Sequence, residues 1–92
     1  MKIKKETIVY CETLEEFTII QTIAFDSEFT WAGYGHAKHL PYFKNYIYFE
    51  DENILRYSDS SYLETTTFKE RHSNWKLYNA SDLLAKYLIK SL

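Results

Sequence analysis

Strand-like segments follow one another in this 92-residue sequence after a single amphipathic helix. Residues 4–11 alternate loosely and predict a first strand, and Thr13 with Glu16 has the spacing of a capping box, which predicts a helix over residues 14–24. Apolar residues recur on one face of that helix at Phe17, Ile20 and Ala24. A strand is therefore expected to lead directly into a helix that has one face to bury.

Four further strands are expected, over residues 29–31, 45–49, 54–57 and 75–78. The middle two are separated by the polar residues 50–53, a loop length that β-hairpins use. Residues 62–68 fit extended chain and irregular loop equally well. After the last strand, Ser81 is expected to cap a closing helix with an apolar stripe of Leu84, Tyr87 and Leu88.

The resulting order β-α-β-β-β-β-α predicts an α+β fold. Strands in a row after one helix favour an antiparallel or mixed sheet with the helices packed on one face, and we expect the sheet to be mostly antiparallel. The length fits one domain over residues 1–92. With 46% hydrophobic and 26% charged residues, the composition is far from that of a disordered chain.

Charge and cysteine content restrict the environment and the partners. A net charge of -2 provides no overall field for holding nucleic acid, so direct nucleic-acid binding is not expected. The one cysteine, Cys11, cannot form an internal disulfide, which suits a reducing compartment. The apolar run 8–11 is far shorter than a signal-peptide core or a membrane span, so we expect a cytoplasmic protein without a membrane partner.

The sequence contains none of the motifs that anchor the major enzyme classes: no Gly-rich phosphate loop, no nucleophile elbow and no H-E-x-x-H. We therefore expect no catalytic residues and no cofactor. Cys11 is more typical of a strand residue in a core than of a nucleophile. His36 and His39 have a metal-like spacing that His72 or a carboxylate would have to complete, but surface histidines explain them better, and no metal is expected.

Aromatic residues are the most unusual feature, with nine tyrosines, six phenylalanines and two tryptophans, more than a core of this size readily encloses. Six tyrosines fall around the loop after the second strand and the hairpin: Tyr34, Tyr42, Tyr46, Tyr48, Tyr57 and Tyr62. Tyrosine provides a large contact area at a small entropic cost, so this cluster predicts a binding surface. Alternatively, the tyrosines cover the open face of the sheet in cross-strand pairs.

The expected partner-binding residues are aromatic anchors and an acidic group that meets a basic patch on the partner. They are Trp31, Tyr34, Tyr46, Tyr48, Tyr57, Glu50, Asp51 and Glu52. An alternative site would hold a nucleotide through aromatic and basic residues, namely Trp31, Tyr34, Lys69, Arg71 and His72. A solvated charged loop also explains residues 69–72. A small nucleic-acid-binding regulator is a third possibility, which the near-neutral charge disfavours.

The succession F-T-W-A-G at 29–33, Y-I-Y-F at 46–49, I-L-R-Y-S at 54–58 and W-K-L-Y-N-A-S-D-L-L at 75–84 resembles a group of small phage-encoded α+β proteins. The resemblance implies a non-enzymatic inhibitor that occludes a bacterial host defence protein, such as an anti-CRISPR protein acting on a nucleic-acid-processing complex. The alternative function is a nucleotide-binding sponge that sequesters a defence signal through the aromatic and basic residues named above. An exposed hairpin edge would also allow pairing with a second copy, giving a homo-oligomer.

Overall fold

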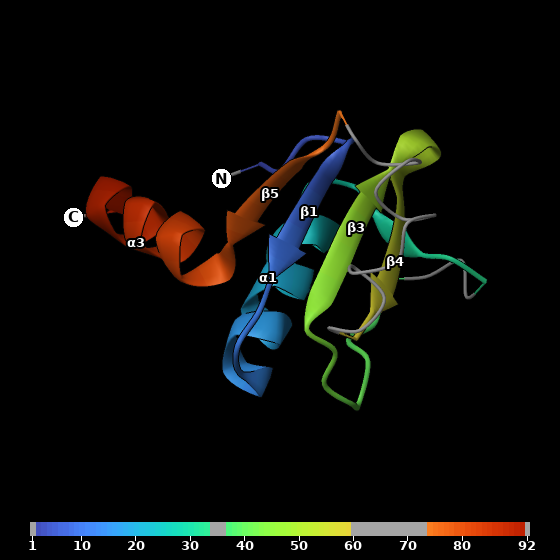
Figure 1. Cartoon of the computed structure of the whole chain (residues 1–92), viewed down its shortest axis with the longest axis horizontal. Coiled ribbons are helices and arrows are strands. Elements are labelled where there is room, and N and C mark those ends of the chain that lie inside the picture. The colour runs from blue at the N-terminus through green and yellow to red at the C-terminus, as the bar shows by residue number, and fades with distance from the viewer. Residues whose placement is uncertain (1, 34–36, 60–73, 92) are drawn as a thin grey trace.

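The computed structural model describes residues 2–33, 37–59 and 74–91, with side chains described as far as residue 86 (Figure 1). The elements in these ranges are β1 (Thr7–Tyr10), α1 (Leu14–Asp26), β2 (Thr30–Trp31), β3 (Tyr46–Glu50), a 3-10 turn η1 (Asp51–Asn53), β4 (Ile54–Ser58), β5 (Lys76–Asn79) and α3 (Ala80–Ser91). The predicted order β-α-β-β-β-β-α and the α+β class are confirmed. Residues 62–68 lie outside the described part of the chain.

The described strands form one mixed sheet with the order β2-β4-β3-β1-β5. β3 pairs antiparallel with β1 and with β4, whereas β5 is parallel to β1 and β2 is parallel to β4. The expectation of a mostly antiparallel sheet is therefore wrong. A hairpin reverses the chain, but the helical connection from β1 through α1 to β2 returns it in the same direction, so of these strands β3 alone runs opposite to the others.

The main core lies between the sheet and α1, which covers the rear face of the sheet in Figure 1. α1 buries Phe17, Ile20 and Ala24, as its spacing predicted. The first turn of α3 adds the buried Ala80 to this core, and Leu83 and Leu84 pack against it. Both helices thus contribute to one face of the sheet, while the rest of α3 extends beyond the β5 edge (Figure 1).

The two helices begin differently from each other. Thr13 caps α1 as predicted, because its hydroxyl oxygen accepts a hydrogen bond from the Glu16 backbone N–H at 3.1 Å. The Glu16 carboxylate accepts in turn from the backbone N–H of Glu12 at 2.8 Å. α3 begins at Ala80, directly after β5, so Ser81 lies inside the first turn and the prediction that it caps this helix is wrong.

Candidate functional site

The hairpin register divides the expected aromatic anchors between two faces of the sheet. A four-residue loop over 50–53 would pair Phe49 with Ile54, but the turn is one residue shorter and Glu50 pairs with Ile54 instead. Glu52 and Asn53 make this tight turn possible by adopting left-handed conformations, with φ of 63° and 58°. Because side chains alternate along a strand, the one-residue shift moves each side chain of β4 to the face opposite to the one expected from a four-residue loop.

In this register Tyr57 pairs with Ile47 and packs against the core on the α1 side. Tyr46 and Tyr48 flank Ile47 in β3 and therefore point to the other face. The single surface expected from Tyr46, Tyr48 and Tyr57 is consequently not formed.

Two of the expected anchors, Trp31 and Tyr48, are buried in the structure. Trp31 is only 2% exposed, and its indole N–H donates to the side-chain oxygen of Gln21 at 3.1 Å. Tyr48 is 4% exposed and its hydroxyl is hydrogen-bonded to that of Ser58. Tyr48 belongs to a small cluster with Ile8 on the face opposite α1. Neither ring offers its surface to a partner in this conformation.

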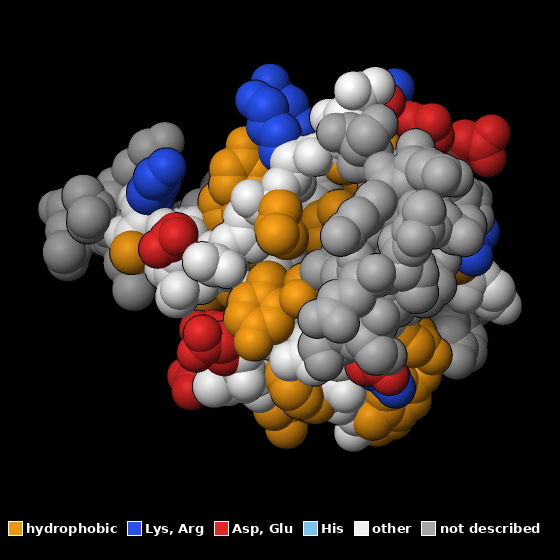
Figure 2. Space-filling view, in the orientation of Figure 1, with side chains coloured by type: hydrophobic (Ala, Val, Ile, Leu, Met, Phe, Trp, Pro, Cys, Tyr) orange, Lys and Arg blue, Asp and Glu red, His pale blue; other side chains and the backbone are white. Residues whose placement is uncertain are grey.

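Tyr46 fits the alternative prediction of cross-strand pairing. It lies opposite Tyr10 in the β1–β3 ladder, and the two ring centroids are 5.1 Å apart. Leu77, which is opposite Ile8 in β5, is 55% exposed on the same face. Figure 2 shows hydrophobic side chains on this face beside α3. This tyrosine pair thus covers part of the sheet, as the simpler interpretation proposed.

The expected acidic residues lie at the hairpin tip, away from the aromatic side chain of Tyr57. Asp51 and Glu52 are exposed, whereas Glu50 is half-buried and forms an ion pair with Arg56. The tip lies at the top of Figure 1, and the segment 37–45 that contacts Tyr57 lies at the bottom. The acidic group and this aromatic side chain therefore do not form one continuous site.

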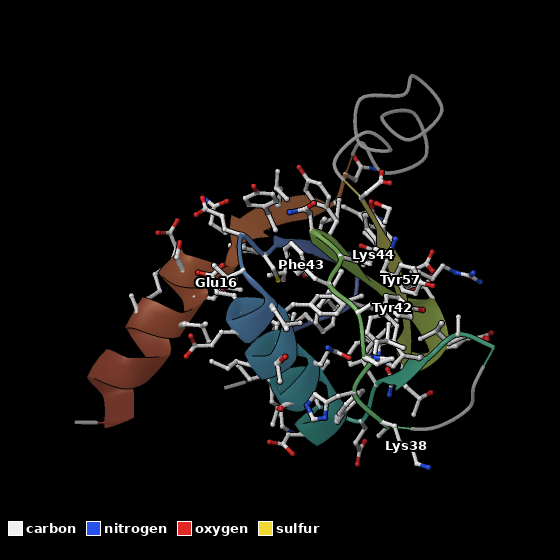
Figure 3. All side chains as sticks on the ribbon, turned by 90° about the horizontal axis from the view of Figure 1, so that it is seen from below. Glu16, Lys38, Tyr42, Phe43, Lys44 and Tyr57 are labelled. Atoms are coloured by element: carbon white, nitrogen blue, oxygen red, sulfur yellow. The ribbon has the colours of Figure 1, made fainter. Side chains whose placement is uncertain are left out.

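The structure instead gathers four residues that we call the aromatic patch: Tyr42, Phe43, Lys44 and Tyr57 (Figure 3). The Tyr42 and Tyr57 hydroxyls are 2.8 Å apart, and their rings meet edge to face with centroids 5.7 Å apart. The Lys44 ammonium lies 5.8 Å from each of these two ring centroids. Tyr42 is 38% exposed and Phe43 is 36% exposed, so part of the patch is open to solvent.

The patch is anchored on the core through further ring contacts. Tyr57 meets Trp31 edge to face at 5.6 Å between centroids, and Phe43 meets Phe17 of α1 in the same way at 5.9 Å. The ring centroids of Phe17 and Trp31 are themselves 6.3 Å apart. Phe43 therefore rests directly on a buried ring, and Tyr42 rests on the half-buried Tyr57, which contacts the buried Trp31. These contacts limit the conformations that the exposed rings can adopt.

Polar contacts hold the segment 37–45 in place. The side-chain oxygen of Gln21 accepts from the Leu40 backbone N–H at 2.8 Å, besides the bond from Trp31. At the other end of the segment, the Asn45 amide donates to the Cys11 carbonyl at 3.1 Å. One fully buried glutamine thus connects α1, β2 and the segment that carries the patch.

The candidate metal ligands do not converge in the described part of the chain, where no three His, Cys, Asp or Glu residues are grouped to hold an ion. His39 contacts α1, with its Nε2 2.7 Å from the Thr22 hydroxyl and its ring edge to face with Phe25. His36 and His72 lie outside the described residues.

Cys11 is a core residue, as predicted, and is fully buried. Burial, with a smaller contribution from the Glu16 carboxylate, raises the pKa of its thiol to about 12. The thiol is therefore protonated at neutral pH and lacks the thiolate that a nucleophile requires.

The alternative nucleotide site cannot be assembled from described residues, because Tyr34, Lys69, Arg71 and His72 all fall outside them and Trp31 is buried. Of the aromatic patch, Tyr57 was an expected anchor and Tyr42 belonged to the tyrosine cluster without being named as an anchor, whereas sequence reasoning missed Phe43 and Lys44. The signal available for them was the aromatic and basic run Y-F-K at 42–44, directly after Pro41 and before a strand.

Comparison with protein-family models gave no match, and neither the curated proteins nor the solved structures gave one. Within the described residues, each helix is too short or too polar to cross a membrane. Functional inference therefore depends on the geometry of the chain itself.

Proposed function

We propose that this protein is a non-enzymatic binding protein that docks its aromatic patch on a partner protein and blocks the covered surface. The observation that carries the proposal is the fixed arrangement of Tyr42 and Tyr57, joined by a hydrogen bond, with Lys44 beside both rings. Tyrosine is enriched among the residues that contribute most of the binding energy at protein interfaces. Rings already held in place lose little conformational entropy on binding.

The class of partner comes from the resemblance to small phage proteins, which implies a host defence protein such as a CRISPR effector complex. The acidic hairpin tip does not adjoin the aromatic patch, so Glu50, Asp51 and Glu52 are not part of the proposed contact surface. Their role is limited to steering the approach of a basic partner over a longer range.

Alanine substitution of Tyr42 together with Phe43 tests the proposal. Both side chains are more than one-third exposed, so the double variant should keep the fold. The matched control is Leu77→Ala, which removes a more exposed apolar side chain from the opposite face of the sheet. Each protein is used to capture partners from a bacterial lysate that contains a CRISPR effector, and to inhibit target cleavage by that effector.

We expect the wild-type chain and Leu77→Ala to capture and inhibit the same partner. The affinity of the Tyr42→Ala/Phe43→Ala variant for that partner should be at least about 100-fold lower, because two interface anchors are removed. Retained capture and inhibition by the double variant would contradict the role of the patch. Failure of the wild-type chain to inhibit any effector, with another protein captured through the patch, would exclude the CRISPR partner but keep the binding role.

A further inference from the structure

A lysine-rich pocket of about 480 Å³ lies at the β5 edge of the sheet, on a different part of the molecule from the aromatic patch. Three segments line it: the N-terminal residues 2–7, the beginning of β5 with Asn74, and α3 through Leu83 and Lys86. β1 and β3 separate β5 from β4, which carries Tyr57, so the pocket and the patch are distinct sites. Figure 2 shows basic side chains at the upper edge of the sheet and on α3.

The charge of this pocket is opposite to that of the whole chain. Its lining includes five lysines and one carboxylate: Lys2, Lys4, Lys5, Lys76, Lys86 and Glu6. The chain has a net charge of -2 and eleven basic residues, so nearly half of its cations line one pocket. Gathering like charges raises the electrostatic free energy of the folded chain, and a bound anion would lower it.

Carboxylates of the described residues neutralise little of this charge. Lys5 lies 3.8 Å from Asp51, and both side chains are more than half exposed. Lys2, Lys4, Lys76 and Lys86 have no ion pair within the described part of the chain. Among the described residues, no carboxylate therefore occupies the ammonium groups of these four lysines.

The wall of the pocket is held by the backbone of Glu6, which has a left-handed φ of 62°. Its N–H donates to the Phe49 carbonyl at 2.6 Å, and its carbonyl accepts from the Lys76 N–H at 3.3 Å. A non-glycine residue in this conformation is strained and persists because neighbouring strands fix it on both sides. The hydrogen bonds therefore hold Glu6, and the lysine-containing residues before it, between β3 and the beginning of β5.

The size and the remaining lining indicate the class of anion. A volume of about 480 Å³ lies within the range of small-molecule sites. Lysine binds phosphate groups as a point charge, and several phosphates would balance several lysines. Tyr78, which is 36% exposed, and Leu83 add a ring and an apolar side chain against which a flat heterocycle can stack.

We propose that this pocket binds a small molecule of the nucleotide class, with its phosphates on the lysines and its base against Tyr78. This site uses none of the residues of the aromatic patch, so it is independent of the proposed docking function. The nucleotide alternative inferred from the sequence relied on a different set of residues.

Calorimetric titration with ATP, AMP and inorganic tripolyphosphate tests the proposal. The wild-type chain should bind ATP more tightly than AMP, because AMP has fewer phosphates, and more tightly than tripolyphosphate, because tripolyphosphate has no base. Tyr78→Leu should weaken ATP about ten-fold through the lost stacking but leave tripolyphosphate unchanged. Tripolyphosphate binding as tightly as ATP would overturn the nucleotide class and assign an inorganic polyphosphate instead.

Lysine variants test the location. Lys4→Gln/Lys76→Gln should weaken ATP by about 100-fold, since each lost charge-assisted contact costs roughly ten-fold. Lys38→Gln/Arg56→Gln removes the same charge from exposed positions outside the pocket and should change the affinity by less than about two-fold, because distant exposed charges are screened. Equal losses in both variants would overturn the pocket assignment.

Two further measurements keep the test decisive. In amide NMR spectra of the wild-type chain, ATP should shift the signals of residues 4–7 and 74–78 and leave those of 42–44 in place; the reverse pattern would contradict the proposal. A single-stranded oligonucleotide that binds more tightly than ATP, with affinity that grows with length, would assign an extended nucleic-acid surface instead. Absence of binding heat and of spectral shifts with all three probes would overturn the proposal altogether.

Discussion

The hydroxyl groups of Tyr42 and Tyr57 lie 2.8 Å apart, so that a hydrogen bond joins the segment before β3 to β4. The same two rings are in edge-to-face contact and flank Lys44. This arrangement makes the aromatic patch a fixed surface. The energetic coupling between the Tyr42 and Tyr57 hydroxyls can be measured.

Tyr42→Phe and Tyr57→Phe each remove one hydroxyl and keep the ring. Each should lower the free energy of unfolding by about 1 kcal/mol, and the double variant should lose less than the sum because both changes break one shared hydrogen bond. Denaturant unfolding of the four proteins gives this coupling energy. Strictly additive losses would show that the hydroxyls do not interact.

Gln21 should be among the most sensitive polar positions. Gln21→Leu leaves the Trp31 indole N–H and the Leu40 backbone N–H without their acceptor in a buried place, which should cost about 2–4 kcal/mol. Thr22→Ala, which loses the exposed contact with His39, should cost less than about 1 kcal/mol. The stabilities of the two variants can be compared by their urea unfolding midpoints. Similar losses of stability at both positions would contradict the connecting role of Gln21.

Cys11 should give the stability a specific pH dependence. Because burial raises the pKa of the thiol from 9.0 in the unfolded chain to about 12, the folded state holds this proton more tightly. The contribution is fully present below pH 9 and is lost as the pH rises toward 12, at up to about 1.4 kcal/mol per pH unit. The tyrosines titrate in the same window, so the measured quantity is the difference between the wild-type chain and Cys11→Ala. A difference that stays constant between pH 8 and 11 would contradict this.

The two helix starts predict opposite results for the same kind of substitution. Thr13→Ala removes the acceptor for the Glu16 N–H and should destabilise the fold by about 1 kcal/mol. Ser81→Ala, inside the first turn of α3, should be neutral or slightly stabilising because alanine has the higher helix propensity. Thermal unfolding distinguishes them, and an equal loss at Ser81 would restore it as a cap.

Local signals were enough to predict the order of the elements. The capping residue Thr13, the spacing of Phe17, Ile20 and Ala24, and the polar run between two β-rich segments each involve residues only a few positions apart. Such signals depend on backbone geometry within one or two turns, which the sequence specifies directly. The burial of Cys11 could be predicted for the same reason, since it is a small apolar residue directly after the first strand.

Only the tertiary structure decided which of these side chains meet. A turn one residue shorter than expected placed Tyr57 on the opposite face from Tyr46 and Tyr48, and the pairing of β5 beside β1 brought Lys76 next to the N-terminal lysines. A local pattern specifies that a strand forms, but register, strand order and direction depend on how distant segments pack together. For that reason the sequence predicted a binding surface rich in tyrosine, while the packed sheet determined which rings remain exposed and where the cations gather.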